Sequence, residues 1–380
     1  MNHPKIAIAG GGTGGHLAPA IALAEELVER YGKDSVHLLS GGNDLERSML
    51  GNAGFDFTCL PVSRPRAGLR SKATTVITTA MAVPAARRAL KNFGAHALVC
   101  VGGYAGLPGA MAASLLRLPV FSLEANAVPG KVTRTIARFA RTCFAHMPLT
   151  RNLDCRVEVV GNPLRKAFLK PAAKADAKRA LGLDSRLPTL LVVGGSQGAG
   201  ALNDVVIESA PELADLQGRF QVLHITGQAD RERAERAWRA LGIHFRVTAF
   251  THNAATWFAA SDVALTRSGA GTISELLAMG IPLLMVPYPH AADDHQRANA
   301  LWVAGSQAGV VVPDSDLGAP LLRELLESFV LSDVTRARAS EAALRLATPG
   351  ATGAILDRIL DEIGLSAPPS DADQEERAAA

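Results

Sequence analysis

The strongest constraint in this sequence is a strand–glycine loop–helix pattern that occurs twice. The first copy, IAIAGGGTGGHLAPA, covers residues 6–20, and the second, TLLVVGGSQGAGALN, covers residues 189–203. In each copy a short apolar run predicts a buried parallel strand, and the glycines predict a tight turn into a helix. Two such openings in a chain of 380 residues predict two Rossmann-like α/β domains with a ligand cleft between them.

The rest of the chain alternates short apolar runs with longer helical stretches, which is typical of parallel α/β layers. Strands are expected in the first half at 5–10, 35–40, 55–60, 97–102, 119–123, 141–145 and 157–161. A connecting segment with a basic helical piece is expected over 164–187. After the second glycine loop, strands are expected at 220–226, 245–250, 261–266, 282–287 and 309–312. The polar end of the chain, residues 366–380, is expected to be a disordered tail.

Composition narrows the class of protein. The chain has four cysteines, none in a C-x-x-C pair, which argues against a zinc knuckle and fits reduced thiols in a cytoplasm. No signal peptide is recognisable, and apolar runs are interrupted by Gly, Pro or charge before about 18 residues, so no spanning helix is expected. The net charge of +3 is too small to identify a partner.

The first glycine loop fits the dinucleotide fingerprint G-x-G-x-x-G at Gly10, Gly12 and Gly15. That fingerprint also requires an Asp or Glu at the end of the second strand, where it binds the ribose hydroxyls. Here the strand ends in Ser40-Gly41-Gly42, and the nearest acids lie in the loop beyond it. The loop therefore favours a phosphate other than that of NAD or FAD.

His16 follows this loop directly. Glycine amides and a helix N-terminus favour an anion, so His16 lies where the reacting group of a phosphate-bearing substrate would lie. Because histidine titrates near neutral pH, it could accept a proton from an attacking hydroxyl. The alternative is that His16 only caps or hydrogen-bonds the loop.

Two more turns of the first half end strands of the same predicted sheet. VGGYAGLPG, residues 101–109, presents Tyr104, and LEANAVPGK, residues 123–131, presents Glu124 and Asn126. Each turn alone reads as a tight connection. Because the carboxyl ends of parallel strands meet at one edge, all three loops together favour a large phosphate-containing ligand.

The second half offers a matching set of polar groups. Ser196 and Gln197 lie at the predicted N-terminus of a helix, which is a second anion cradle. The stretch RSGAGT, residues 267–272, leads into another helix with Glu275 in its first turn. Glu275 could accept both hydroxyls of a ribose, or it could form a capping box with Thr272.

The polar stretch PHAADDHQRANA, residues 289–300, follows a predicted strand. Gln296 and Asn299 share a helix face, and their amides suit sugar hydroxyls because each offers a donor and an acceptor. Residues 293–295, Asp-Asp-His, suggest a metal site but lack a further ligand at recognisable spacing. The D-x-D pairs at 314–316 and 371–373 are not placed like a nucleotide-sugar metal site, so no metal is expected.

These motifs, taken in order, resemble those of a known family. They are GGTGGH (11–16), GGYAGLPG (102–109), LEAN (123–126), GNPLR (161–165), GGSQGA (194–199), RSGAGTISE (267–275) and Q-x-x-NA (296–300). The set is similar to that of the MurG family, the bacterial N-acetylglucosaminyltransferases that convert lipid I to lipid II. The resemblance runs from the first strand to about residue 360. Where that family commonly has HEQNG, this chain has LEANA, with Glu124 and Asn126 kept.

The resemblance implies a GT-B fold with two Rossmann-like domains. The acceptor and membrane domain would be 1–163 and the donor domain 164–349, with a last helix, 350–364, crossing back to the first domain. UDP-N-acetylglucosamine would bind the donor domain. Its diphosphate would lie at Ser196, Gln197 and the helix start formed by Ala270, Gly271, Thr272, Ile273 and Ser274. Its ribose would lie at Glu275, its uracil near Thr251 and Arg267, and its sugar near Gln296 and Asn299.

On the acceptor side, the resemblance implies that the glycine loops hold the diphosphate of lipid I. The residues concerned are Thr13, Gly14, Gly15 and Tyr104, with Asn126 and Arg165 lining the cleft. The reaction would be an inverting transfer without a cofactor or metal. The base would be His16, with Glu124 as the alternative base.

A lipid-linked acceptor requires contact with a membrane. Residues 57–123 contain no Asp or Glu, and the basic segment 64–91 encloses an uncharged apolar stretch at 73–86. Such a segment suits reversible docking on anionic lipid, or it could be an ordinary helix with a solvated basic face. The expected location is the cytoplasmic face of the membrane, with other cell-wall synthesis proteins as possible partners and no nucleic acid.

Two other functions are compatible with parts of the pattern. One is a different GT-B enzyme, either a transferase for a soluble acceptor or a UDP-sugar epimerase, against which the basic apolar segment argues. The other is a non-catalytic scaffold that binds a nucleotide sugar. The presence of His16, Glu275 and Gln296 together argues against the scaffold.

Overall fold

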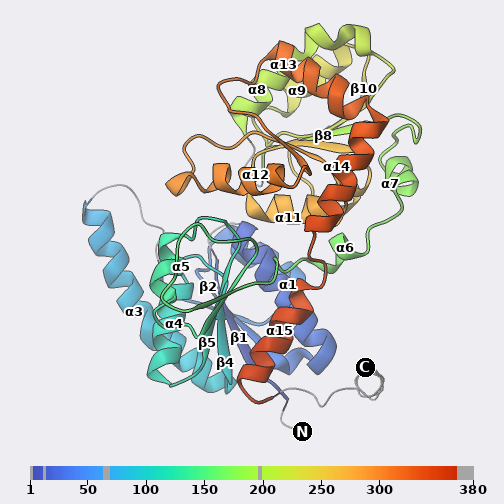
Figure 1. Cartoon of the computed structure of the whole chain (residues 1–380). Coiled ribbons are helices and arrows are strands. Elements are labelled where there is room, and N and C mark those ends of the chain that lie inside the picture. Colours follow the sequence, from blue (N-terminus) through green and yellow to red (C-terminus); the bar gives the residue numbers. More distant parts are fainter. Residues whose placement is uncertain (1–2, 12–13, 63–68, 196–198, 366–380) are drawn as a thin grey trace, which may run out of the picture.

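Two parallel β-sheets, each covered by helices on both faces, form the molecule (Figure 1). The computed structural model describes residues 3–11, 14–62, 69–195 and 199–365. The first half of the chain forms a seven-stranded sheet and the second half a six-stranded sheet. This is the two-domain α/β architecture that the repeated glycine-loop pattern predicts, and it agrees with the GT-B fold that the family resemblance implies. The expected tail, 366–380, lies outside the described residues.

The first sheet has the strand order β3-β2-β1-β4-β5-β6-β7. Its strands are β1 (Ile6–Ala9), β2 (Val36–Ser40), β3 (Phe57–Cys59), β4 (Ala97–Cys100), β5 (Val120–Glu124), β6 (Thr142–Ala145) and β7 (Arg156–Val159). Its helices are α1 (Gly14–Tyr31), α2 (Asp44–Ala53), α3 (Leu69–Phe93), α4 (Gly106–Leu115) and α5 (Lys131–Ile136). Because β1, β4 and β5 are neighbours, the loops that follow them lie side by side at one edge.

Alternate residues of these strands build two separate cores. Ile6 and Ile8 of β1 face α1, while Ala7 and Ala9 face the other side, against α3 and α4. The last helix, α15 (Ala351–Glu362), packs beside α1 in the first of these cores through residues such as Ile355. Burial on both faces explains why the strands read as nearly continuous apolar runs.

The second sheet has the order β10-β9-β8-β11-β12-β13. Its strands are β8 (Thr189–Val193), β9 (Gln221–Ile225), β10 (His244–Thr248), β11 (Val263–Thr266), β12 (Leu283–Met285) and β13 (Gly309–Val311). Its helices are α8 (Gly200–Ser209), α9 (Arg231–Ala240), α10 (Ala254–Ala259), α11 (Ala270–Ala278), α12 (His295–Gly305), α13 (Ala319–Leu325) and α14 (Asp333–Leu346). The connecting segment contains the short helices α6 (Lys166–Leu169) and α7 (Lys174–Ala180). The predicted strands are all present in the structure, most of them shorter by one to three residues.

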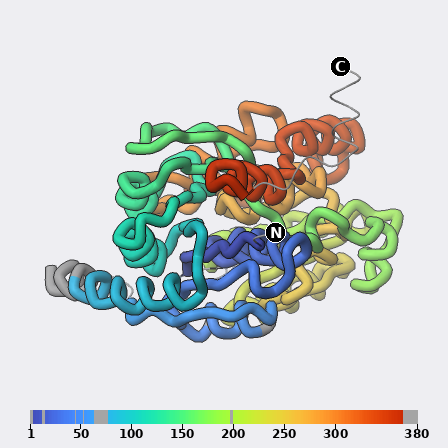
Figure 2. The backbone as a smooth tube through the Cα atoms, turned by 90° about the horizontal axis from the view of Figure 1, so that it is seen from below, coloured from blue at the N-terminus to red at the C-terminus, as the bar shows by residue number. Residues whose placement is uncertain are grey.

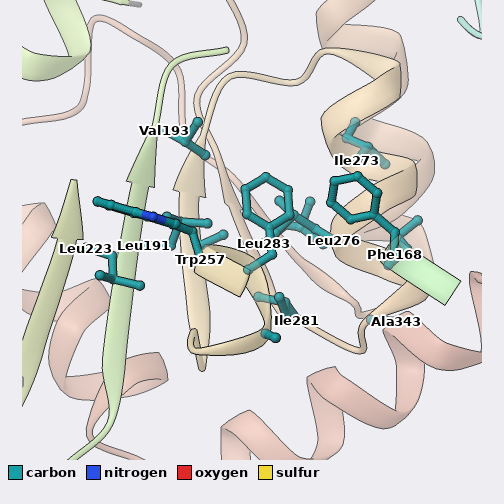
Figure 3. Packing of buried hydrophobic residues seen from close by; sticks show 14 of the residues in the cluster. Phe168, Leu191, Val193, Leu223, Trp257, Ile273, Leu276, Ile281, Leu283 and Ala343 are labelled. Carbon is teal, nitrogen blue, oxygen red and sulfur yellow. The ribbon is translucent and has the colours of Figure 1, made fainter. Parts of the chain in front are cut away.

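One face of the second sheet carries a core in which α11 is central. Ile273 and Leu276 of α11 pack against Phe168, Leu283 and Trp257 (Figure 3). All five side chains are at least nine-tenths buried. This packing holds α11 firmly against the sheet, with its N-terminus just beyond the end of β11.

Two glycine loops of the first sheet are in direct backbone contact. A Cβ atom added to Gly103, whose φ is +77°, would lie 1.8 Å from the carbonyl oxygen of Gly11. A Cβ on Gly10 would lie 2.1 Å from Val101 Cγ2. Only glycine at these positions lets the loops after β1 and β4 approach so closely. The structure at this edge of the sheet therefore depends on direct contact between the loop after β1 and the loop after β4.

We expect Gly103→Ala to destabilise the protein, because the methyl group meets main chain that has no rotamer to escape into. The free energy of unfolding should fall by about 2 kcal/mol or more, from the clash and the positive φ together. Thermal unfolding measures this change. Gly51→Ala is the control, because a Cβ there has open space and lies within α2. Equal melting temperatures for Gly103→Ala and the parent protein would contradict this account of the loops.

Candidate active site between the two sheets

His16 lies in the first turn of α1, against the loop that follows β4. The ring is so close to this loop that a Cβ on Gly102 would lie 2.7 Å from its Nδ1 atom. Burial lowers the pKa of His16 below its usual value, and the nearby Glu124 carboxylate and a hydrogen bond with the Val101 backbone partly offset this effect. His295, from the other domain, adds to the lowering. The imidazole is therefore held in the neutral form that can accept a proton.

Glu124 ends β5 and is buried, with both carboxylate oxygens occupied. Its Oε1 accepts hydrogen bonds from the backbone N–H of Asn126 at 3.0 Å and from Asn126 Nδ2 at 3.1 Å. Its Oε2 accepts one from the Gly130 N–H at 3.0 Å. Glu124 thus shapes the loop that presents Asn126 to the cleft, and its charge lies near His16.

Asn299 links the two domains through its fully buried amide. Its Oδ1 accepts from the Ala127 N–H at 2.9 Å, across the cleft. Its Nδ2 donates to Asn126 Oδ1 at 3.1 Å and to the Ser268 carbonyl oxygen at 3.0 Å. Three good hydrogen bonds therefore join the loop after β5 to the loop after β11. Asn299, expected near a sugar, serves in this structure as a bridge between the domains.

A second bridge is formed by His146, which follows β6. The ring is 3.3 Å from Ser274 Oγ and meets Trp302 edge-to-face, with ring centroids 5.3 Å apart. Burial lowers the pKa of His146 to about 4, so the ring is neutral at physiological pH. A small apolar cluster that includes Met147 and Ala270 lies beside this contact. Ser274 therefore faces the first domain.

Arg165, in the segment that connects the two domains, contacts Glu275 of α11. Arg165 Nη2 donates to Glu275 Oε1 at 3.3 Å, and its guanidinium lies 4.9 Å from the ring centre of Phe168. Burial raises the pKa of Glu275 to about 7, although the Arg165 charge and hydrogen bond act in the opposite direction. Glu275 consequently changes charge near physiological pH, at the edge of the cleft.

The N-terminus of α11 faces the first domain, where Ala270 clusters with Ala127 and Met147. Its N-cap is Gly269, which has no side chain, so the amide groups of Ala270, Gly271 and Thr272 are not capped by that residue. Cβ atoms on Gly269 or Gly271 would meet nothing within 4 Å. The capping box considered for Thr272 and Glu275 is wrong, because the helix has already begun at Ala270. The side chain of Ile273 faces the core (Figure 3), so only its backbone could contact a ligand.

Gln296 lies in the first turn of α12. Its Oε1 accepts from the backbone N–H groups of Ser268 at 3.1 Å and Tyr288 at 2.9 Å. These two donors fix which end of the amide is oxygen. Nε2 is consequently the donor end of the side chain, as a sugar hydroxyl acceptor would require.

Arg267 is buried beneath the loop that follows β12. Its Nη1 donates to the Val286 carbonyl oxygen at 3.2 Å and pairs with Asp314. Its guanidinium lies 5.8 Å from the ring centre of Tyr288. Arg267 thus organises this part of the second domain, and the first aspartate of the D-x-D pair at 314–316 neutralises it.

The acidic residues 293–295 do not form a metal cluster. Asp293 pairs with Arg134 and Arg151 of the first domain, at 3.5 and 3.9 Å, and Asp294 lies 4.0 Å from Arg297. Both aspartates have left-handed backbone conformations, with φ of 52° and 54°. Within the described parts of the chain, no three His, Cys, Asp or Glu side chains are grouped as for a metal ion.

For the remaining residues expected in the site, the structure gives a position or a single contact at most. Thr13, Ser196 and Gln197 lie outside the described residues. Gly14 is the first residue of α1 and Gly15 is exposed, while Tyr104 is half-buried in the loop after β4. The hydroxyl of Thr251 accepts from the Asn253 N–H at 3.1 Å, in the loop after β10.

Comparison with known proteins decides the family. Residues 6–145 match the N-terminal domain of glycosyltransferase family 28, and residues 189–351 match its C-terminal domain. A UDP-N-acetylglucosamine–N-acetylmuramyl-(pentapeptide) pyrophosphoryl-undecaprenol N-acetylglucosamine transferase from an Anaeromyxobacter species is 36% identical, over 93% of this chain and 92% of that protein. The enzyme of the same name from Geobacter sulfurreducens is 35% identical, over 94% and 98%. This chain belongs to that transferase family.

Solved structures agree with the assignment. The crystal structure of MurG from Acinetobacter baumannii is 26% identical, with a TM-score of 0.73, and covers 94% of this chain and 100% of that chain. UDP-GlcNAc 2-epimerase from Neisseria meningitidis is 14% identical with a TM-score of 0.64, over 94% and 100%, a likeness that concerns the fold alone. The transferase assignment separates this chain from the epimerases that share its architecture. None of the described helices is long and apolar enough to cross a membrane.

Proposed function

We propose that this chain transfers N-acetylglucosamine from UDP-N-acetylglucosamine to lipid I, the undecaprenyl-pyrophosphoryl-N-acetylmuramyl-pentapeptide, and so forms lipid II for the cell wall. Membership of the transferase family supports the reaction. The observation that carries the assignment of roles is the half-buried His16, whose lowered pKa keeps it neutral, close to Glu124 of its own domain and to His295 at the start of α12 in the other domain. A base on one domain and an anion cradle on the other suit transfer between two phosphate-linked substrates.

The donor binds the second domain in this proposal. The amides at the start of α11 receive the diphosphate, since a helix N-terminus favours negative charge. Glu275 accepts hydrogen bonds from the ribose hydroxyls, and Gln296 Nε2 donates to the sugar. Thr251, in the loop after β10, and Arg267, in the loop after β11, lie toward the uracil, with Ser196 and Gln197 near the diphosphate.

Catalysis is an inverting displacement. The C4 hydroxyl of the muramyl sugar attacks C1 of the α-linked donor, His16 takes the hydroxyl proton, and the bond from C1 to the UDP oxygen breaks. A β-1,4 bond forms and UDP leaves. His16 is preferred over Glu124 as base, because three N–H groups already occupy the oxygens of Glu124. The Glu124 charge instead stabilises the imidazolium that forms.

The charge on the departing diphosphate is stabilised by amides and helix N-termini in this proposal, so that no metal is needed for the chemistry. The acceptor diphosphate lies on the first domain, at the loop containing Thr13, at Gly14, Gly15 and Tyr104, and toward Asn126 and Arg165. Both diphosphates are thus held by backbone groups of the two sheets.

Membrane contact is proposed for α3, which lies on the outer flank of the first domain (Figure 2). Ile77 and Met81 are 58% and 65% exposed on this helix, and Arg87, Arg88 and Lys91 are exposed farther along it. An apolar patch followed by basic residues suits reversible docking on anionic lipid. The protein would then work at the cytoplasmic face of the membrane.

The direct test is UDP release from UDP-N-acetylglucosamine with a short-chain lipid I analogue, in EDTA. Release that depends on the analogue is expected, and His16→Ala should lower kcat by about 10²–10⁴-fold. His244→Ala is the control, because that histidine is exposed on the edge strand β10. Since the pKa of His16 is lowered, kcat should decline only below the usual histidine range. Full activity of His16→Ala would exclude it as the base, and no acceptor-dependent release would overturn the function.

Donor affinity should depend on the charge of Glu275. With a pKa of about 7, its ionised fraction rises about tenfold between pH 6 and pH 8, and the affinity for UDP-N-acetylglucosamine should rise with it. Isothermal titration calorimetry at several pH values measures this change. Glu275→Gln should bind more weakly and lose the pH dependence. An unchanged pH dependence in that variant would assign it to another group.

Docking through α3 predicts that Ile77→Asp/Met81→Asp weakens binding to vesicles containing anionic phospholipid by about tenfold or more. Turnover of a water-soluble acceptor should stay normal. The matched control is Val334→Asp/Leu344→Asp, which alters two exposed apolar side chains of the second domain. Equal vesicle binding by both double variants would argue against α3 as the docking surface. Sedimentation of the protein with vesicles measures this binding.

A further inference from the structure

A cavity of about 390 Å³ lies on the first domain between α5 and residues 152–154. It is lined on the helix side by Lys131, Arg134 and Arg138, and on the other side by Asn152 and Asp154 among others. Lys131 and Arg134 share one side of α5 because they are three residues apart, and Arg138 follows in the turn after the helix. None of the roles proposed above uses this cavity.

The cavity is positively charged. Asp154 is the one carboxylate that lines it, and it lies 3.5 Å from Arg138, in a pair whose side chains are 71% and 72% exposed. Such an exposed pair is weak and leaves most of the Arg138 charge available to a ligand. No carboxylate of the described residues lies within ion-pair distance of Lys131. The cavity therefore suits an anion, and Asn152 adds amide groups that suit a peptide.

One end of the cavity adjoins the cleft. Arg134 pairs with Asp293 of the second domain at 3.5 Å, so this side of the cavity touches the donor-side loop. At the start of α5, the Gly130 N–H donates to Glu124, which lies near His16. A molecule whose reacting group is at His16 could therefore extend along α5 into the cavity.

The reacting hydroxyl and the peptide of the acceptor are attached at positions that are compatible with this path. Its reacting hydroxyl is at C4 of the muramyl sugar, and its peptide hangs from the lactoyl group on the neighbouring C3. A pentapeptide extends up to about 17 Å. At helical rise, Lys131 and Arg134 lie about 4.5 Å apart along α5, and Arg138 follows in the turn after the helix. An extended pentapeptide is therefore long enough to pass along all three cations, and it carries at least its C-terminal carboxylate.

We propose that this basic cavity is a subsite for the carboxylates of the acceptor's peptide stem. The inference rests on the proposed function, because it assumes that the muramyl sugar lies at His16. Lys131 and Arg138 supply the charge for recognition, and Arg134, which pairs with Asp293, places the subsite beside the second domain. The subsite selects acceptors that carry an acidic peptide over those that carry none.

The test measures transfer by the variant Lys131→Gln/Arg138→Gln to two acceptor analogues. With the full pentapeptide, KM for the acceptor should rise about three- to tenfold at nearly unchanged kcat, as expected for two exposed charges. With an analogue that ends in a lactoyl amide and has no peptide, KM should not change. The control Lys33→Gln/Arg236→Gln removes two exposed charges elsewhere and should behave as the parent protein on both analogues.

Several outcomes would overturn the subsite. One is an equal rise in KM for both analogues, which would mean that these cations act on the diphosphate or on the fold. Another is unchanged KM for both analogues with weaker binding to anionic vesicles, which would assign the cavity to lipid headgroups. If the parent protein transfers to neither analogue, the proposed function fails instead. The subsite is then tested by the anisotropy of a labelled free pentapeptide. This peptide should bind Lys131→Gln/Arg138→Gln more weakly than it binds the parent protein.

Discussion

The amide of Asn299 fixes the relation between the two domains. It is buried, and its three hydrogen bonds connect Ala127 and Asn126 on one side to Ser268 on the other. A buried amide that lost these partners would incur a large desolvation penalty, so the bridge holds only at one separation of the domains. The contact of His146 with Ser274 is compatible with that same separation. A small apolar cluster of Ala127, Met147 and Ala270 also spans the two domains, so polar and apolar contacts together join them.

The fold was predictable from the sequence because its signals are local. Each βα unit carries its own apolar run, glycine turn and helix start, and these patterns identify both sheets without knowledge of the partner segments. Strand ends were predicted less well, because the last residues of an apolar run, such as Val101, belong to the loops that form the site. The capping box at Thr272 failed for a similar reason. The spacing fits a capping box, but the helix begins two residues earlier, at Ala270.

The site was predictable as a set of loops but not as a set of contacts. Order along the strands implies that His16 and Glu124 lie at one edge, whereas nothing local indicates that Arg165 reaches Glu275, 110 residues away. His146 lies in no recognisable sequence motif, and its bridging role is visible only from its contacts with Ser274 and Trp302 in the structure. Asn299 bridges the domains in this structure, and the sugar contact expected from its residue type and from the family resemblance stays a prediction, since the two roles look alike in sequence.

The two left-handed aspartates, Asp293 and Asp294, have a mechanical consequence. Such backbone costs roughly 1–3 kcal/mol per residue and persists only where the surroundings hold it. Arg134 and Arg151 of the opposite domain pair with Asp293, whereas Asp294 pairs with Arg297 of its own domain. The conformation at Asp293 is therefore held in part by the other domain, and that at Asp294 from within its own. The turn before α12 thus couples the backbone of the second domain to the charges of the first.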